Sequence, residues 1–123
     1  MSYTLGITII YTRDTKKMTQ FYTEIMGLPV VKEQSSDTFV ALATAGGTLL
    51  ALQDASRNKP YEQVAPGGIA LGFEVDDVDA TWRNWQAKGA KTLTAPEDLP
   101  FGRAFDAQDP EGHLLTVYKL RNA

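Results

Sequence analysis

The sequence predicts a small, soluble α+β domain in which one β-α-β-β-β unit occurs twice. Three observations indicate this fold. Runs of β-branched and aromatic residues occupy residues 5–12 and 69–75, as expected for strands. An Asp follows each run where a helix cap should stand, and apolar residues at helical spacing come next. Each half then ends in two strand-like runs joined by a turn that contains Gly.

The first unit is assigned to residues 1–53. Asp14 is placed to cap a helix over residues 15–26, and Gly27 is placed to end that helix in a left-handed conformation. Gly46-Gly47 indicates a hairpin between the last two strands of the unit. The strands are predicted at residues 5–12, 30–31, 38–44 and 48–53.

Residues 54–68 are polar, contain several Pro and Gly, and are interpreted as a linker. The pattern restarts after them, so the second unit is assigned to residues 69–123 of the single domain 1–123. A shift of 63 positions places Asp14 on Asp77, which supports an internal repeat.

The second unit is predicted to contain one helix and four strands. Asp76 or Asp77 caps the helix, which ends near Gly89, and the spacing of Trp82 and Trp85 favours packing of both in the core. The strands are predicted at residues 69–75, 91–94, 103–108 and 114–120, with the turn Asp109-Pro110-Glu111-Gly112 between the last two.

Composition and charge exclude several classes of function. The chain has 123 residues, 43% of them hydrophobic, and a formal net charge of -3. Lys and Arg are scattered without a basic stripe, so we expect no nucleic-acid partner. No run approaches the ~20 apolar residues of a membrane span, and no signal peptide is evident, so we expect a cytoplasmic protein without a membrane partner. The absence of Cys excludes disulfides, thiolate nucleophiles and Cys-based zinc sites.

Three segments occur in an order that indicates a family. They are Phe21-Tyr22 followed by Met26-Gly27-Leu28, the restart at residues 72–80, and the closing Asp109-Pro110-Glu111-Gly112-His113. Together they resemble the glyoxalase/bleomycin-resistance/dioxygenase group, the vicinal oxygen chelate superfamily, over essentially the whole chain. The resemblance implies a curved mixed sheet around a ligand cleft between the modules, with the helices outside. The modules would pair within one chain or across a dimer, and we expect a homodimer.

The resemblance also implies where a divalent metal would be bound. Enzymes of the group usually carry a His in the first strand of each module and a Glu in the last. The corresponding positions here, counted from the capping Asp residues and the last turn, are Ile7, Ala51, Ala70 and Thr116. Ile and Ala have no donor atom in the side chain, and a lone Thr hydroxyl is a poor ligand. We therefore expect no metal and no other cofactor.

Strand alternation predicts which side chains line the cleft. If the four metal-equivalent positions face inward, every second residue of the same strands does so too. Phe101, in the loop before the penultimate strand, and Arg103, at the start of that strand, are added to this set. The predicted ligand-binding residues are therefore Ile7, Ile9, Tyr11, Leu49, Ala51, Ala70, Gly72, Glu74, Phe101, Arg103, Thr116 and Tyr118. Such a mostly apolar surface suits a largely apolar small molecule. The alternative is that its own side chains or a partner subunit fill the concavity.

Four of the polar and aromatic candidates each have two interpretations. Glu74 could accept hydrogen bonds from a ligand or exchange a proton, or could simply reach water at the end of its strand. Arg103 could pair with Glu74 or an anionic ligand group, or could lie on the surface. Phe101 could cover the cleft or anchor its loop. His113, the only histidine, is expected to have a structural or surface role rather than one in binding or proton transfer.

The function we predict is binding without catalysis. The protein would resemble the bleomycin-resistance branch and hold an apolar or aromatic compound, for sequestration or antibiotic resistance. The enzymatic alternative is a glyoxalase-like lyase or isomerase, or a hydrolase, that works without metal and uses Glu74 or Tyr11 as acid or base. A metal-dependent glyoxalase or dioxygenase would need ligands that the sequence does not offer.

Overall fold

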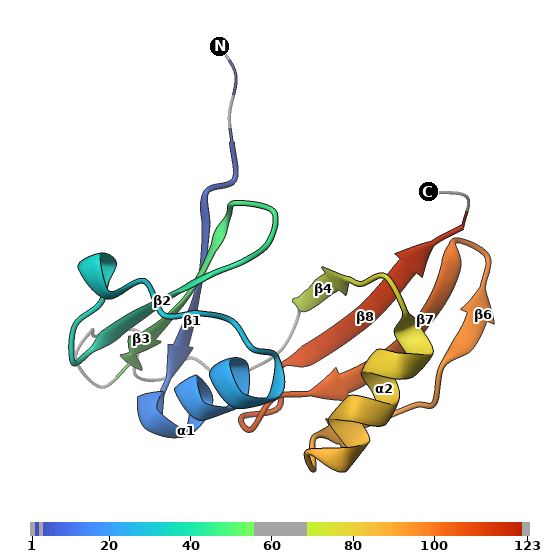
Figure 1. The fold of residues 1–123 in the computed structure, drawn as a ribbon. Coiled ribbons are helices and arrows are strands. Elements are labelled where there is room, and N and C mark those ends of the chain that lie inside the picture. Colours follow the sequence, from blue (N-terminus) through green and yellow to red (C-terminus); the bar gives the residue numbers. More distant parts are fainter. Residues whose placement is uncertain (1, 3, 56–68, 122–123) are drawn as a thin grey trace. The chain divides into compact units, whose positions relative to one another are not determined.

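A computed structural model describes residues 2, 4–55 and 69–121 (Figure 1). The chain divides into two compact units, Met1–Ala65 and Pro66–Ala123. Each unit packs helix against a mixed β-sheet, which confirms the predicted α+β class. Most of the predicted linker, residues 56–68, lies outside the described residues. No helix in the described part of the chain has the length and apolar character needed to span a membrane.

The sheet of the first unit has three strands in the order β1-β3-β2. These are β1 (Ile7–Thr12), β2 (Phe39–Ala43) and β3 (Leu49–Asp54). β1 is parallel to β3, and β2 is antiparallel to it, so the first strand of the unit pairs with the last. Asp54, the first residue of the predicted linker, is the final residue of β3.

The strand predicted at residues 30–31 is present only as a single bridge between Val30 and Leu42. The 3-10 helix η2 (Lys32–Gln34) follows at once. Because this helix turns the chain away from β2, pairing cannot extend beyond one residue. The Ser35 hydroxyl fixes the turn by donating to the Val31 carbonyl at 2.7 Å.

The predicted helix over residues 15–26 is present as two consecutive segments, α1 (Thr15–Gln20) and the π-helical turn η1 (Phe21–Ile25). The carboxylate of Asp14 accepts a hydrogen bond from the Lys17 amide at 3.0 Å, as expected of the N-cap. Gly27 has a φ of 73° and ends the helix in the left-handed region, as predicted. Phe21 and Tyr22 belong to the π-helical turn and are both buried, and their rings meet edge to face.

The sheet of the second unit has five strands. Their order is β4-β8-β7-β5, and β6 also pairs with β7. The strands are β4 (Ala70–Glu74), β5 (Lys91–Thr92), β6 (Glu97–Leu99), β7 (Gly102–Gln108) and β8 (Leu114–Leu120). β4 is parallel to β8, which repeats the pairing of first and last strands in the first unit. The sequence did not predict β6, because Glu-Asp-Leu has low strand propensity and is held by pairing with β7.

The helix of the second unit, α2 (Val78–Ala87), lies across β7 and β8 in Figure 1. Asp77 caps it by accepting from the Ala80 amide at 3.0 Å. Trp85 is buried and meets Phe105 of β7 edge to face, with ring centroids 5.5 Å apart. Its predicted core packing is confirmed, whereas Trp82 is only half-buried.

Each sheet therefore has one face covered by its own helix and one that is not, which we call the helix-free face. The alternation predicted for the strands is present: Ile10 is 7% exposed beneath the helix, whereas Ile9 on the helix-free face is 42% exposed. Leu115 and Val117 of β8 are likewise buried on the α2 side, and Leu114 is exposed on the other. The helix-free faces contain most of the residues that the sequence proposed for ligand binding.

Candidate functional site

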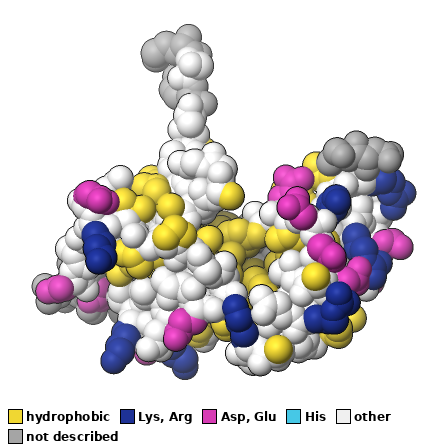
Figure 2. Space-filling view, viewed as in Figure 1, with side chains coloured by type: hydrophobic (Ala, Val, Ile, Leu, Met, Phe, Trp, Pro, Cys, Tyr) yellow, Lys and Arg dark blue, Asp and Glu magenta, His cyan; other side chains and the backbone are white. Residues whose placement is uncertain are grey.

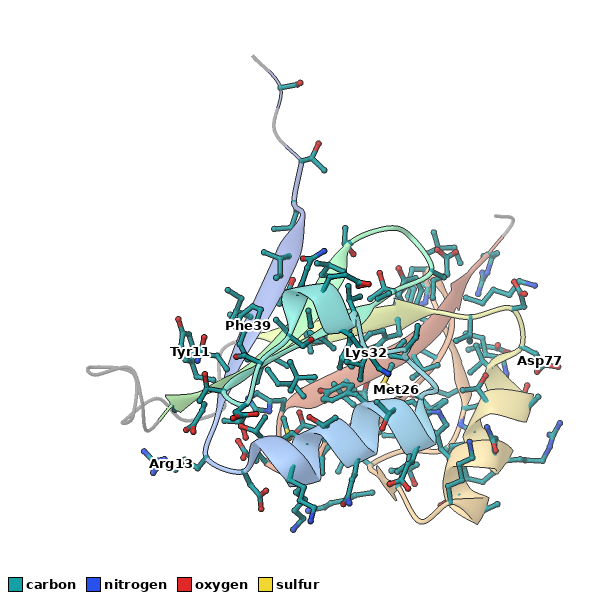
Figure 3. All side chains as sticks on the ribbon, turned by 60° about the vertical axis from the view of Figure 1, so that its left-hand side comes forward. Tyr11, Arg13, Met26, Lys32, Phe39 and Asp77 are labelled. Atoms are coloured by element: carbon teal, nitrogen blue, oxygen red, sulfur yellow. The ribbon has the colours of Figure 1, made fainter. Side chains whose placement is uncertain are left out.

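The helix-free face of the first unit is almost entirely apolar. The register of its three strands places on this face Ile7, Ile9, Tyr11, Phe39, Ala41, Ala43, Leu49, Ala51 and Gln53. Gln53 uses its side-chain amide to donate to the Thr38 carbonyl at 3.0 Å. Figure 3 shows Tyr11 and Phe39 near the same end of the sheet, and Figure 2 shows hydrophobic side chains gathered over this part of the unit.

The helix-free face of the second unit is built differently, from small, aromatic and acidic side chains. The register of β4, β7 and β8 places on it Ala70, Gly72, Glu74, Ala104, Asp106, Gln108, Leu114, Thr116 and Tyr118. Glu74 is exposed at the end of β4, which agrees with the interpretation that it reaches water. Ala70 and Gly72 are also exposed, so this part of the face has room above it.

Two aromatic rings stand beside the small residues of this face. Tyr118 lies close to Gly72, where a Cβ would come within 3.3 Å of the ring. Phe101, in the turn between β6 and β7, meets Tyr118 edge to face with ring centroids 6.5 Å apart. Phe101 remains 45% exposed, so it is not buried as a loop anchor. The structure thus brings Gly72, Phe101 and Tyr118 of the predicted set together.

Asp106 lies on this face but is not among the predicted ligand-binding residues. It lies opposite Thr116 in the β7–β8 ladder, and the Thr116 hydroxyl donates to its Oδ1 at 2.8 Å. Alternation counted from the metal-equivalent positions covers the strands at residues 69–75 and 114–120 but not residues 103–108. The same rule, with the turn at residues 109–112 fixing the register, places Asp106 beside Thr116.

Arg103, one of the predicted ligand-binding residues, does not lie on the helix-free face. It lies on the α2 side of β7, where its guanidinium binds both carboxylate oxygens of Asp79 at 2.9 Å and Asp98 at 3.0 Å. The hypothesis that it pairs with Glu74 is therefore wrong, because alternation turns its side chain to the opposite face of the sheet. Hydrogen bonding to Arg103 lowers the pKa of Asp79, and the same bond, with that to Asp98, raises the pKa of the guanidinium.

A pocket of about 340 Å³ borders Arg103 on that side of the second unit. Its lining is mostly charged and includes Asp76, Lys119 and Arg121. Figure 2 shows acidic and basic side chains interspersed over this region. Most of its lining residues are charged, unlike those predicted for the ligand site.

His113 is held at the β7–β8 turn by Asp109. Its Nδ1 donates to Oδ2 of Asp109 at 2.8 Å, and Asp109 also accepts from the backbone amides of Glu111 and His113 at 3.0 Å each. The hydrogen bond to the buried Asp109 raises the pKa of His113. This geometry agrees with the structural role expected for His113.

The donor atoms of the four metal-equivalent positions do not fit a divalent ion. Ile7, Ala51 and Ala70 have no side-chain donor, and the hydroxyl of Thr116 is already hydrogen-bonded to Asp106. Within residues 2, 4–55 and 69–121, no three His, Cys, Asp or Glu side chains gather closely enough to hold a metal ion. No step of a reaction is therefore assigned to a metal in this chain.

Comparison with known proteins gives the family. The protein-family model of the Glyoxalase/Bleomycin resistance protein/Dioxygenase superfamily matches residues 4–117 of this sequence. The chain belongs to this superfamily. The resemblance inferred from the three sequence segments is thereby confirmed.

Three relatives show how far the likeness to the superfamily extends. A protein of Agrobacterium tumefaciens with a solution NMR structure is 34% identical, covers 99% of this chain and 100% of its own, and has a TM-score of 0.81. TnmS3, an antibiotic binding protein from Streptomyces, is 26% identical over 98% of both chains, with a TM-score of 0.80. The phenazine antibiotic resistance protein EhpR of Enterobacter agglomerans is 26% identical, with 95% of this chain and 92% of that protein covered.

Proposed function

We propose that this protein binds a small, largely apolar or aromatic compound on the helix-free face of its second unit and holds it chemically unchanged. The observation that carries the proposal is the surface formed by Gly72, Phe101 and Tyr118 in the second unit. Small residues leave space there, and two aromatic rings border that space. Flat aromatic molecules gain from such a border through ring contacts and through the burial of apolar area.

Two relatives support a role in sequestration or resistance. TnmS3 is an antibiotic binding protein, and EhpR is a phenazine antibiotic resistance protein. The position of His113 supports binding rather than catalysis, since its Nδ1 is engaged with Asp109 at a turn instead of with a nucleophile. We further propose, from the resemblance, that the protein acts as a cytoplasmic homodimer; sedimentation as a monomer at micromolar concentration would contradict the dimer.

The proposal is tested by calorimetric titration with a panel of aromatic compounds that includes phenazines, acridines and naphthoquinones. We expect at least one to bind and to raise the melting temperature, since a ligand that binds only the folded state stabilises it. Recovery of the compound unchanged after incubation, checked by mass spectrometry, separates holding from turnover. Conversion of the compound would instead favour the lyase or isomerase alternative.

A matched pair of variants locates the site. Ala70 is exposed on the helix-free face, and Ala87 is exposed on α2 away from it. We expect Ala70→Trp to abolish binding and Ala87→Trp to leave it unchanged, with little loss of stability in either. Unfolding of Ala70→Trp, or binding equal to the parent, would contradict the placement of the ligand on this face.

A further inference from the structure

Asp106 is a carboxylate held in a fixed position on the helix-free face of the second unit. Its backbone amide donates to the Thr94 hydroxyl at 3.0 Å, and its carbonyl accepts from the Leu93 amide at 2.8 Å. On its other side it pairs with Thr116 in the β7–β8 ladder. The backbone of Asp106 is therefore hydrogen-bonded on the side of residues 93–94, and its side chain is hydrogen-bonded to Thr116 on the other side.

The carboxylate of Asp106 is half-buried but has no cationic partner among the described residues. Its Oδ1 accepts a hydrogen bond from the neutral hydroxyl of Thr116 at 2.8 Å. Three other Asp residues of this unit have a basic partner: Asp79 and Asp98 bind Arg103, and Asp109 binds His113. A partly desolvated carboxylate without a counter-charge is unfavourable, and a bound cation would relieve that cost.

The charges on the same face favour a cation as well. Glu74 and Asp106 lie on its central strands, and the register adds Glu97 on β6. Among the described strands, the pairing register places one basic residue on this face, Lys91 of β5. A face with this excess of carboxylates attracts positive groups and repels anions.

The aromatic rings stand next to Asp106 along the sheet. Tyr118 of β8 lies opposite Ala104 of β7. This pair is the next one on the same face after the pair of Asp106 and Thr116. Ala104 is small and buried, so no bulky side chain from this position stands between the ring and the carboxylate. A flat ligand resting against Tyr118 and Phe101 would therefore bring a charged ring nitrogen or amine within reach of Asp106. Ring contact and charge pairing would act on the same molecule.

We propose that the ligand of this face is an aromatic compound with a positive charge, and that Asp106 determines this specificity with Thr116 as its positioning residue. The inference rests on the proposed binding function and names the ligand class for it. Oδ1 is directed by the Thr116 hydroxyl, and the second carboxylate oxygen pairs with the cation.

Three phenazines of nearly equal shape test the charge requirement. Equilibrium dialysis measures the binding of phenazine, of cationic N-methylphenazinium and of anionic phenazine-1-carboxylate to the full chain. We expect the cation to bind most tightly and the anion least. Asp106→Asn keeps the shape of the side chain and removes its charge, and we expect it to weaken N-methylphenazinium binding at least about tenfold while changing phenazine binding less than about twofold.

Control variants separate Asp106 from the general charge of the face. Glu74→Gln removes an exposed carboxylate from the same face, and we expect it to weaken N-methylphenazinium binding less than Asp106→Asn does, because solvent screens an exposed charge. Thr116→Val should weaken binding of the cation, and Thr116→Ser, which restores the hydroxyl, should recover it. Melting temperatures of all variants confirm that the fold persists.

Each outcome decides one of the two claims. Equal binding of phenazine and N-methylphenazinium by the parent, or an unchanged preference in Asp106→Asn, would overturn the charge specificity and leave the binding function intact. Failure of the parent to bind any of the three compounds at millimolar concentration would overturn the charge specificity, and failure to bind any compound of the wider aromatic panel would overturn the binding function as well.

Discussion

The ring of Tyr118 lies across the backbone of Gly72, so that a Cβ at position 72 would stand 3.3 Å from Cε1 of the ring. This relationship joins the parallel strands β4 and β8 on the helix-free face. The missing side chain of Gly72 lets the ring lie low against the sheet. The same ring meets Phe101, so the identity of residue 72 controls the position of the aromatic border of the proposed site.

Gly72→Val should therefore reduce ligand binding without unfolding the protein. The branched side chain displaces the Tyr118 ring, which is flexible and can move. Replacing Gly within a strand by Val recovers strand propensity, so we expect the free energy of unfolding to change by less than about 1 kcal/mol. Titration with a compound bound by the parent, together with urea denaturation, measures both effects. Gly6→Val is the control, since Gly6 has no neighbouring atom within 4 Å of an added Cβ; equal binding by both variants would refute the role of the ring.

Gly102→Ala should destabilise the second unit. A Cβ at Gly102 would collide with the carbonyl oxygen of Lys119, a backbone atom that cannot move without disturbing the β7–β8 ladder. We expect a loss of about 1–3 kcal/mol in the free energy of unfolding, as in other overpacked positions. Gly46→Ala serves as control because nothing lies within 4 Å of its added Cβ. Parent-like stability of Gly102→Ala in urea denaturation would contradict the close approach of the two strands.

Arg103→Lys should lower the denaturation midpoint slightly and leave ligand binding unchanged. Lys cannot reproduce the two-pronged contact of the guanidinium with Asp79. The group is exposed, so solvent screens much of the interaction and the loss is small. Because Arg103 lies on the α2 side of β7, the helix-free face should be unaffected. A clear fall in affinity, with the fold intact, would restore Arg103 to the binding site.

The pair of His113 and Asp109 should make stability depend on pH. The pKa of His113 is raised in the folded protein by its hydrogen bond to Asp109, so the folded state binds the proton more tightly than the unfolded chain. The resulting stabilisation is complete below the unfolded pKa of about 6.5 and is lost as pH rises through the higher pKa of the folded state. Melting temperatures of the parent and of His113→Gln between pH 5 and 9 test this prediction.

We expect the difference in melting temperature to be largest at the acidic end and to shrink toward pH 9. A difference that grows with pH, or one that is constant, would show that protonated His113 is not the stabilising species. Glu111→Gln tests the smaller contribution of the neighbouring carboxylate to the raised pKa.

Features that depend on local chemistry were predictable from the sequence. Asp14 and Asp77 cap helices because a carboxylate satisfies free amides wherever a helix begins, and Gly27 ends a helix because of its backbone freedom. Strand alternation likewise placed Ile9 and Ile10 on opposite faces, because it follows from backbone geometry alone.

Features that depend on partners distant in the sequence were not predictable to the same degree. β6 exists because β7 offers it an edge, although the residues Glu97–Leu99 have little strand propensity. Arg103 was misplaced because its partner Asp79 lies on α2, far from it in the sequence. The local signal for a strand covers residues 103–108 correctly but says nothing about which neighbours it meets.

The pairing of first and last strands has a consequence for how the chain is made. Ile7 of β1 pairs with Leu49 of β3, and Ala70 of β4 pairs with Leu114 of β8. During translation, β1 and β4 must each wait for the ribosome to release a distant strand before they gain a neighbour. Contacts between residues so far apart in the sequence slow folding, since the intervening loop must be closed first. Until then, the exposed apolar edge of each nascent unit is the part of the protein most open to chaperones and to aggregation.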